Sequence, residues 1–109
     1  MSIVTGYRNA ALKATKTTVK AAPGIVYGWK IQNLDGADAY LQLYDALAAN
    51  VTVGTTTPTF SIWLPASGGD DLILPVPIRF TVGIVVAATT TIGGAVAPTN
   101  GELVNLFFH

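Results

Sequence analysis

Acidic side chains are the residues in this chain that most readily suggest chemistry. Asp70 and Asp71 follow Gly68 and Gly69, and carboxylates on a flexible loop can bind calcium. Side chains of neighbouring residues on an extended segment point apart, however, so a polar turn that ends before Leu72 explains the same residues. We therefore expect neither a metal ion nor a cofactor.

The chain contains few residues that could carry out nucleophilic catalysis. A Ser-His-Asp triad would depend on the one histidine, His109, which has no carboxylate beside it in the sequence. The absence of cysteine removes thiolate nucleophiles and disulfides, and a single histidine cannot build a structural zinc site. A pair of catalytic carboxylates would need two distant acids brought together by the fold, and no pattern supports this. We expect that the protein is not an enzyme.

Aromatic residues offer a second possibility. Trp63, Tyr40 and Tyr44 fall at positions that alternation places on the solvent side of strands. Stacked on a flat surface, such rings bind glycans or nucleic acid bases. The same rings also pack across strands or within a subunit interface, and the sequence leaves these alternatives open.

Composition restricts the partners. Half of the 109 residues are hydrophobic and 11% are charged, against about 25% in a typical domain. This favours a subunit that covers its surface against neighbours over a β domain coated in Thr and Ala. A net charge of zero gives no attraction for nucleic acid or an anionic membrane. Residues 1–16 lack an apolar signal-peptide core, so we expect synthesis in a cytoplasm.

Alternating apolar residues predict strands, and residues 24–45 give the strongest signal. Ile25, Tyr27, Trp29 and Ile31 recur at every second position, and a second alternating run begins at residue 39. The Asp35-Gly36 dipeptide between them predicts a β-hairpin.

Further strands are expected over residues 12–20, 59–64, 72–76, 78–88 and 102–108, with Pro75 and Pro77 confining one of them to an edge or a bend. Residues 1–9 are expected to be an N-terminal arm and residues 10–109 a single domain. Seven or eight strands separated by turn residues predict an all-β, antiparallel two-sheet sandwich with jelly-roll or immunoglobulin-like connectivity.

Several loose motifs occur here in a particular order: Asn33, the segment AYLQLYD, the loop VGTTTP, the strand TFSIWLP and the segment IRFTVGIVVAATTT. In this order, over residues 19–91, they resemble small virion structural proteins of tailed bacteriophages. The resemblance implies a β-sandwich subunit of a phage particle with no catalytic residues.

The function that the resemblance implies is that of a capsid decoration or cement subunit, made in the host cytoplasm and located in the virion. Its partners would be the major capsid protein and copies of itself, in a homo-oligomer such as a trimer. The alternatives are a neck, tail or fibre component, or a glycan-binding adhesion module. The residues expected to make contacts are Tyr7, Arg8, Trp63, Phe107, Phe108 and His109.

Overall fold

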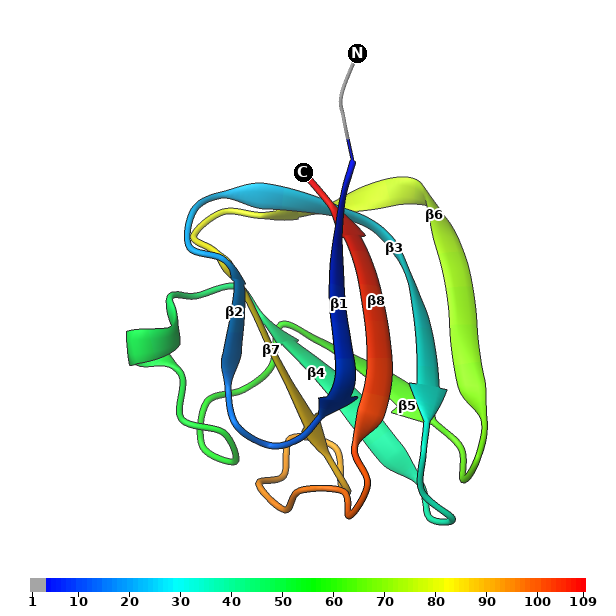
Figure 1. The fold of residues 1–109 in the computed structure, drawn as a ribbon. Coiled ribbons are helices and arrows are strands. Elements are labelled where there is room, and N and C mark those ends of the chain that lie inside the picture. Colours follow the sequence, from blue (N-terminus) through cyan, green and yellow to red (C-terminus); the bar gives the residue numbers. More distant parts are fainter. Residues whose placement is uncertain (1–3) are drawn as a thin grey trace.

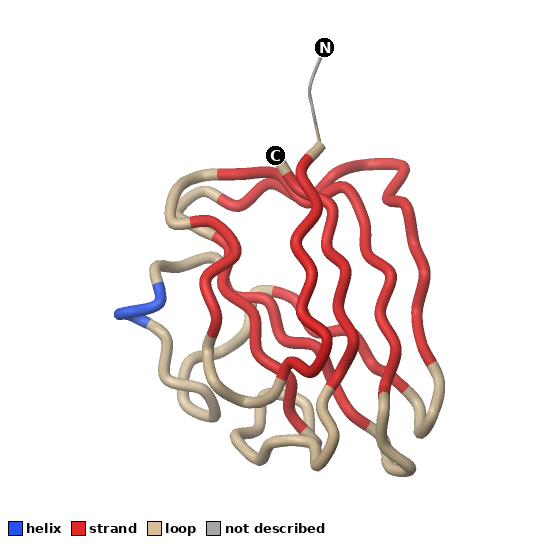
Figure 2. The backbone as a smooth tube through the Cα atoms, in the orientation of Figure 1, coloured by secondary structure: helices blue, strands red, loops and turns tan. Residues whose placement is uncertain are grey.

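Two four-stranded sheets pack face to face in the computed structural model, which describes residues 4–109 (Figure 1). The strands are β1 (Thr5–Leu12), β2 (Thr17–Lys20), β3 (Gly24–Asn33), β4 (Ala39–Tyr44), β5 (Phe60–Leu64), β6 (Gly69–Phe80), β7 (Ile84–Thr89) and β8 (Glu102–Phe108). One short 3-10 helix, η1 (Ala48–Asn50), interrupts the long connection after β4 (Figure 2). Within residues 4–109, no helix has the length and apolar character needed to cross a bilayer.

The strand order is that of a jelly roll. Sheet A has the order β1-β8-β3-β6 and sheet B the order β2-β7-β4-β5, and the paired strands are antiparallel. Most connections pass from one sheet to the other, while β4 and β5 are neighbours in sheet B. This confirms the predicted two-sheet sandwich. It also excludes the immunoglobulin-like alternative, which would place the first, second, fifth and fourth strands together in one sheet.

The core lies between the sheets. Sheet A contributes Trp29 and Ile31 from β3, and sheet B contributes Leu41 and Leu43 from β4. The rings of Trp29 and Phe60 meet at a centroid distance of 5.7 Å across this space. The other buried members of the core are Leu12, Val26, Ile62, Leu64, Phe80, Ile84, Val86, Ala88, Val104 and Leu106. Their alternation along each strand explains why the sequence reads so clearly as strands.

The hairpin predicted for residues 24–45 is wrong, because β3 and β4 belong to different sheets. The buried side chain of Asn33 shapes the connection between them. Its Oδ1 accepts a hydrogen bond from the backbone N–H of Asp35 at 3.0 Å, and its Nδ2 donates to the carbonyl of Ala37 at 2.8 Å. This turn sends the chain across the core instead of back along β3.

The predicted inward face of β3 is correct only in part. Trp29 and Ile31 are buried, but Val26 takes the inward place expected for Ile25 and Tyr27. The pairing of β3 with both β6 and β8 shifts between Val26 and Gly28. Such a β-bulge adds one residue to the strand and reverses the alternation on either side of it.

The single long strand predicted over residues 78–88 is two strands. Phe80 ends β6 in sheet A and Ile84 begins β7 in sheet B. The carboxylate of Asp45 holds the crossing by accepting hydrogen bonds from the backbone N–H groups of Thr81, Val82 and Gly83. A continuous apolar run cannot reveal this crossing, because both halves face the same core.

The N-terminal arm predicted over residues 1–9 needs correction as well. Residues 1–3 lie outside the described part, but β1 begins at Thr5 and pairs with β8. Tyr7 packs against the core, which explains why the segment joins the sheet. The strand predicted over residues 12–20 is likewise divided, since β1 ends at Leu12 and β2 begins at Thr17.

Candidate functional site

The outer face of sheet A is open to solvent along rows of residues that cross all four strands. Sheet B is different, because the connection after β4 covers part of its outer face. There it forms a second small core of Tyr44, Val51, Val85 and Ala87. No comparable cluster covers sheet A in residues 4–109. The exposed side chains of sheet A therefore remain available to a partner.

One row of this face combines two glycines with two large apolar residues. In register across β1, β8, β3 and β6, the row reads Gly6, Phe107, Gly28 and Ile73. Ile73 is 70% exposed. A Cβ atom on Gly28 would lie 2.3 Å from the carbonyl oxygen of Leu72, so this position requires glycine, whereas a Cβ on Gly6 would have nothing within 4 Å. We call these four residues the apolar row.

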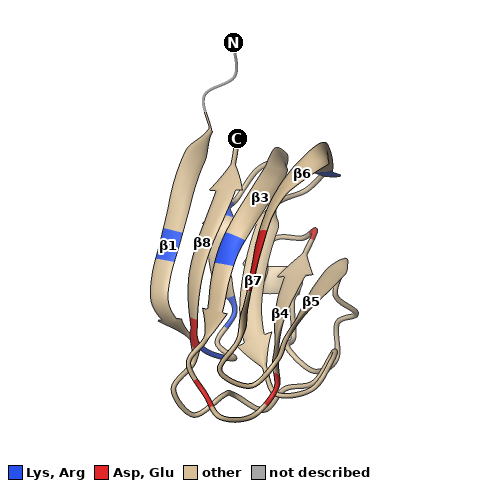
Figure 3. Cartoon of the chain, turned by 90° about the vertical axis from the view of Figure 1, so that its right-hand side faces the viewer, with Lys and Arg blue, Asp and Glu red and all other residues tan. Residues whose placement is uncertain are grey.

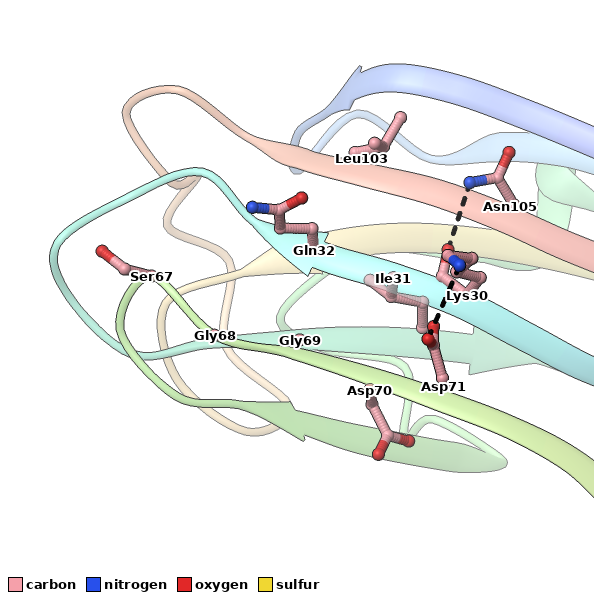
Figure 4. A pocket seen from close by; sticks show the side chains of 10 residues that line it. All are labelled: Lys30, Ile31, Gln32, Ser67, Gly68, Gly69, Asp70, Asp71, Leu103 and Asn105. Carbon is pink, nitrogen blue, oxygen red and sulfur yellow. Dashed lines mark hydrogen bonds and ion pairs between the residues drawn. The ribbon is translucent and has the colours of Figure 1, made fainter.

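A second row beside it is polar and charged. It reads Arg8, Asn105, Lys30 and Asp71 across the same four strands. Lys30 and Asp71 form an ion pair at 3.7 Å, and Asn105 Nδ2 donates to the Lys30 carbonyl oxygen at 3.3 Å (Figure 4). Figure 3 shows the basic positions on β1 and β3 at the same level of the sheet. We call these four residues the charged row.

A hollow of about 460 Å³ lies at the charged row and extends toward the turn before β6. Among its lining residues are Lys30, Gln32, Ser67, Asp71 and Asn105 (Figure 4). These side chains can donate and accept hydrogen bonds, but they include no histidine and no aromatic ring. The hollow is suited to polar contacts with another surface.

The edge of sheet A formed by β6 is apolar over several residues. Pro75, Val76 and Pro77 are exposed, with Val76 77% exposed, and Leu72 is partly so. The predicted edge position of this strand is confirmed by the strand order. Because proline cannot donate a backbone hydrogen bond, this edge is a poor template for adding another strand, and its apolar side chains are what it offers a partner.

The six residues predicted to make contacts are divided among four places. Arg8 and Phe107 come together on the outer face of sheet A, whereas Tyr7 and Phe108 pack partly against the core. His109 is exposed beyond β8, where its backbone N–H and carbonyl bond the backbone of Ile25 at 2.8 and 2.9 Å.

The remaining residue, Trp63, lies on sheet B, on the other side of the molecule. It is 56% exposed and stands opposite Tyr40 across the β4–β5 pair. Its indole N–H donates to Asp38 Oδ2 at 3.3 Å, and Asp38 Oδ1 accepts from the backbone N–H of Ala66 at 3.0 Å. These bonds fix the ring in an orientation that leaves much of it in solvent.

Asp70 and Asp71 do not share a site. Asp70 accepts a hydrogen bond from the indole N–H of Trp29 at 2.7 Å, whereas Asp71 faces Lys30 on the outer side (Figure 4). Among residues 4–109, no group of three or more His, Asp or Glu side chains is arranged to hold a metal ion. The alternation expected of neighbouring side chains on a strand thus holds here.

Sequence reasoning missed Glu102, which is fully buried at the start of β8. Neither of its carboxyl oxygens has a hydrogen-bond partner within residues 4–109, and the same is true of Asp35 Oδ2. Burial, together with the nearby charge of Asp35, raises the pKa of Glu102 to about 8. The inward alternation of Glu102 with Val104 and Leu106 was the signal that could have revealed it.

No protein-family model, curated protein or solved structure matches the chain.

Proposed function

We propose that this protein is a non-enzymatic structural subunit of a tailed-bacteriophage particle, most specifically a decoration subunit that binds the major capsid protein on the head. The observation that carries the proposal is the apolar β6 edge, where Val76 is 77% exposed between two exposed prolines. An exposed apolar strip of this kind on a small domain marks an interaction surface.

Three further points support the proposal. The order of motifs over residues 19–91 resembles that of phage virion proteins. The jelly roll is a fold that many viral capsid domains use, although it also serves lectins and cupins and therefore does not by itself indicate function. The low charge content is typical of subunits that cover their surface in an assembly.

A decoration subunit of this type would act by adding contacts between neighbouring capsid proteins. Each copy contributes a small buried apolar area, at about 25 cal/mol per Å² of apolar surface. Repetition over a whole particle turns modest contacts into a large resistance to internal pressure.

Quantitative mass spectrometry of purified particles tests the proposal, with copies counted against the major capsid protein. Hundreds of copies per particle would support a decoration subunit. A few to a few dozen copies would place the protein at a vertex, neck or tail and overturn the decoration role. If the chain is abundant in cells but missing from particles, the whole virion proposal fails.

A second candidate function, a glycan-binding module, is favoured by Trp63. Its exposed ring, held by Asp38 and adjacent to Tyr40, has the form of a stacking platform for a sugar. Titration with oligosaccharides, followed by tryptophan fluorescence, tests it. A saturable change that Trp63→Ala abolishes would favour this function, and a flat response across a broad glycan set would exclude it.

A further inference from the structure

The outer face of sheet A has a pattern that is complementary to itself. Across the four strands, the apolar row alternates between positions without a side chain and positions with a large one: Gly6, Phe107, Gly28, Ile73. Counted from the two edges of the sheet, Gly6 on β1 therefore corresponds to Ile73 on β6, and Phe107 on β8 corresponds to Gly28 on β3. A pattern of this kind allows a surface to interlock with a copy of itself.

The operation that produces the match is a two-fold axis parallel to the strands, midway between β8 and β3. This axis brings β8 of one copy over β3 of the other, and β1 over β6. Ile73 then lies over Gly6 of the second copy, a position with nothing within 4 Å of its missing Cβ. Phe107 lies over Gly28, which is buried under Ile73 of its own chain, so the open position in the apolar row is Gly6.

The same axis pairs the charges. Arg8 on β1 is brought over Asp71 on β6 of the second copy, and Asn105 over Lys30. Asp71 is already 3.7 Å from Lys30 of its own chain, so Arg8 of the second copy would complete a cluster of one carboxylate between two cations. Because the operation is two-fold, each such contact occurs twice.

We propose that the outer face of sheet A is the interface of a symmetric homodimer, in which Ile73 of each copy packs over Gly6 of the other and Arg8 of each copy pairs with Asp71 of the other. The arrangement agrees with the way sheets pack, since two sheets face to face keep their strand directions within about 30°. It is also isologous, as most dimer interfaces are. The inference concerns self-association and does not rest on the proposed place in a phage particle.

The affinity expected of this dimer is moderate. The face is four strands wide, or about 19 Å at the usual strand spacing of about 4.8 Å. A face of this width buries an area at the small end of the range found for specific protein–protein interfaces. We expect a dissociation constant in the micromolar range, which an ultracentrifuge can measure.

Sedimentation velocity of the purified full chain, over about 1–200 µM, provides the test. The expected result is a reversible monomer–dimer equilibrium. Arg8→Asp places two acids opposite each other at both contacts, and Asp71→Arg places two cations there, so each variant should weaken the dimer by about tenfold or more. Lys13→Asp alters net charge as Arg8→Asp does, but it lies in the exposed connection between β1 and β2 and should leave the dimer unchanged.

Mixing the two charge variants gives the sharpest readout. In a heterodimer of Arg8→Asp with Asp71→Arg, both contacts again join opposite charges, so dimers should return to roughly the affinity of the unaltered chain. The control is a mixture of Lys13→Asp with Asp71→Arg, which has the same total charges. Its heterodimer keeps one Arg8–Asp71 contact and sets two arginines together at the other, so it should form more weakly than the heterodimer of the two charge variants, and most dimers should be Lys13→Asp homodimers. Heterodimers of equal stability in both mixtures would mean non-specific attraction and would overturn the proposed pairing.

Gly6→Tyr tests the interlocking row without charge. An added side chain at Gly6 meets nothing within 4 Å in the monomer but would occupy the place of Ile73 from the second copy. Circular dichroism should show an unchanged fold, and the dimer should be lost. The proposal is overturned if the unaltered chain stays monomeric throughout the concentration range, if it forms trimers, or if its dimer persists in both Gly6→Tyr and Arg8→Asp.

Discussion

Glu102 lies buried near Asp35, and neither oxygen of its carboxyl group has a hydrogen-bond partner among residues 4–109. Burial, reinforced by the charge of Asp35, raises the pKa of Glu102 to about 8 from an ordinary value of 4.5. The folded chain therefore keeps a proton on Glu102 at neutral pH that the unfolded chain releases. This difference makes the stability of the fold depend on pH.

We predict that Glu102 makes the protein less stable as pH rises. The proton bound to Glu102 contributes its full share to the free energy of unfolding below about pH 4.5. This contribution decreases by about 1.4 kcal/mol per pH unit as pH rises toward 8, and the free energy no longer changes with Glu102 above that pH. Glu102→Gln should flatten this decrease and be more stable than the unaltered chain at about pH 9. Urea unfolding across this range measures both effects. An equal slope in Glu102→Gln would contradict the assignment.

Asp45 is predicted to stabilise the crossing between the sheets. Partial burial would raise the pKa of Asp45, but hydrogen bonds from Thr81, Val82 and Gly83 outweigh burial and lower the pKa. The stability that these bonds provide is present above the ordinary pKa of 3.8 and is lost as pH falls through the lower, folded-state value. Asp45→Asn should cost about 1–3 kcal/mol in the free energy of unfolding at neutral pH. Chemical denaturation gives this value, and a cost below about 0.3 kcal/mol would refute the role.

Two glycines of the apolar row should respond in opposite ways to alanine. Gly28→Ala places a methyl group 2.3 Å from the Leu72 carbonyl oxygen, so the β3–β6 pairing must distort, at a cost of about 2 kcal/mol or more. Gly6→Ala meets no neighbour within 4 Å and should be neutral or stabilising, because alanine loses less backbone entropy than glycine. Thermal unfolding of both variants provides the comparison, with Gly6→Ala as the control for the loss of glycine itself.

The β6 edge should be required for attachment to the capsid but not for folding. Val76→Lys puts a charge at a position that is 77% exposed, so it should change the free energy of unfolding by less than about 0.5 kcal/mol. The Val76→Lys substitution should strongly reduce the amount of purified protein that co-sediments with phage particles prepared without this protein. Val96→Lys is the matched control, since Val96 is 66% exposed in the loop between β7 and β8. Equal binding by both variants would argue against the β6 edge as the capsid contact.

Local patterns in the sequence located most strands, but they could not assign partners. Trp29 and Ile31 of β3 and Leu41 and Leu43 of β4 face one core, and this is also what a hairpin would show. Strands that lie opposite each other and strands that lie side by side bury the same kind of residue. The connection between β3 and β4 is shaped instead by the buried amide of Asn33, which a strand pattern does not reveal.

The residues of the outer face of sheet A could not all be predicted from the sequence, because strand pairing decides which of them become neighbours. Arg8 and Phe107 were predicted to make contacts, and they do lie on one open face. Their neighbours Gly28, Lys30 and Ile73 join them only through the register of three strand pairs. Glu102 was overlooked because an acid at the start of a strand is ordinarily exposed, although its alternation with Val104 and Leu106 places it on their buried face.

The jelly-roll order also determines when the outer face of sheet A can exist during synthesis. β8 lies between β1 and β3, so β1 has no partner in the sheet until residues 102–108 have left the ribosome. Pairings between such distant segments form slowly. Because each row of the face takes one residue from each of four strands, an incomplete chain has no assembled face. The homodimer that we propose would therefore form only after residues 102–108 have paired with β1 and β3.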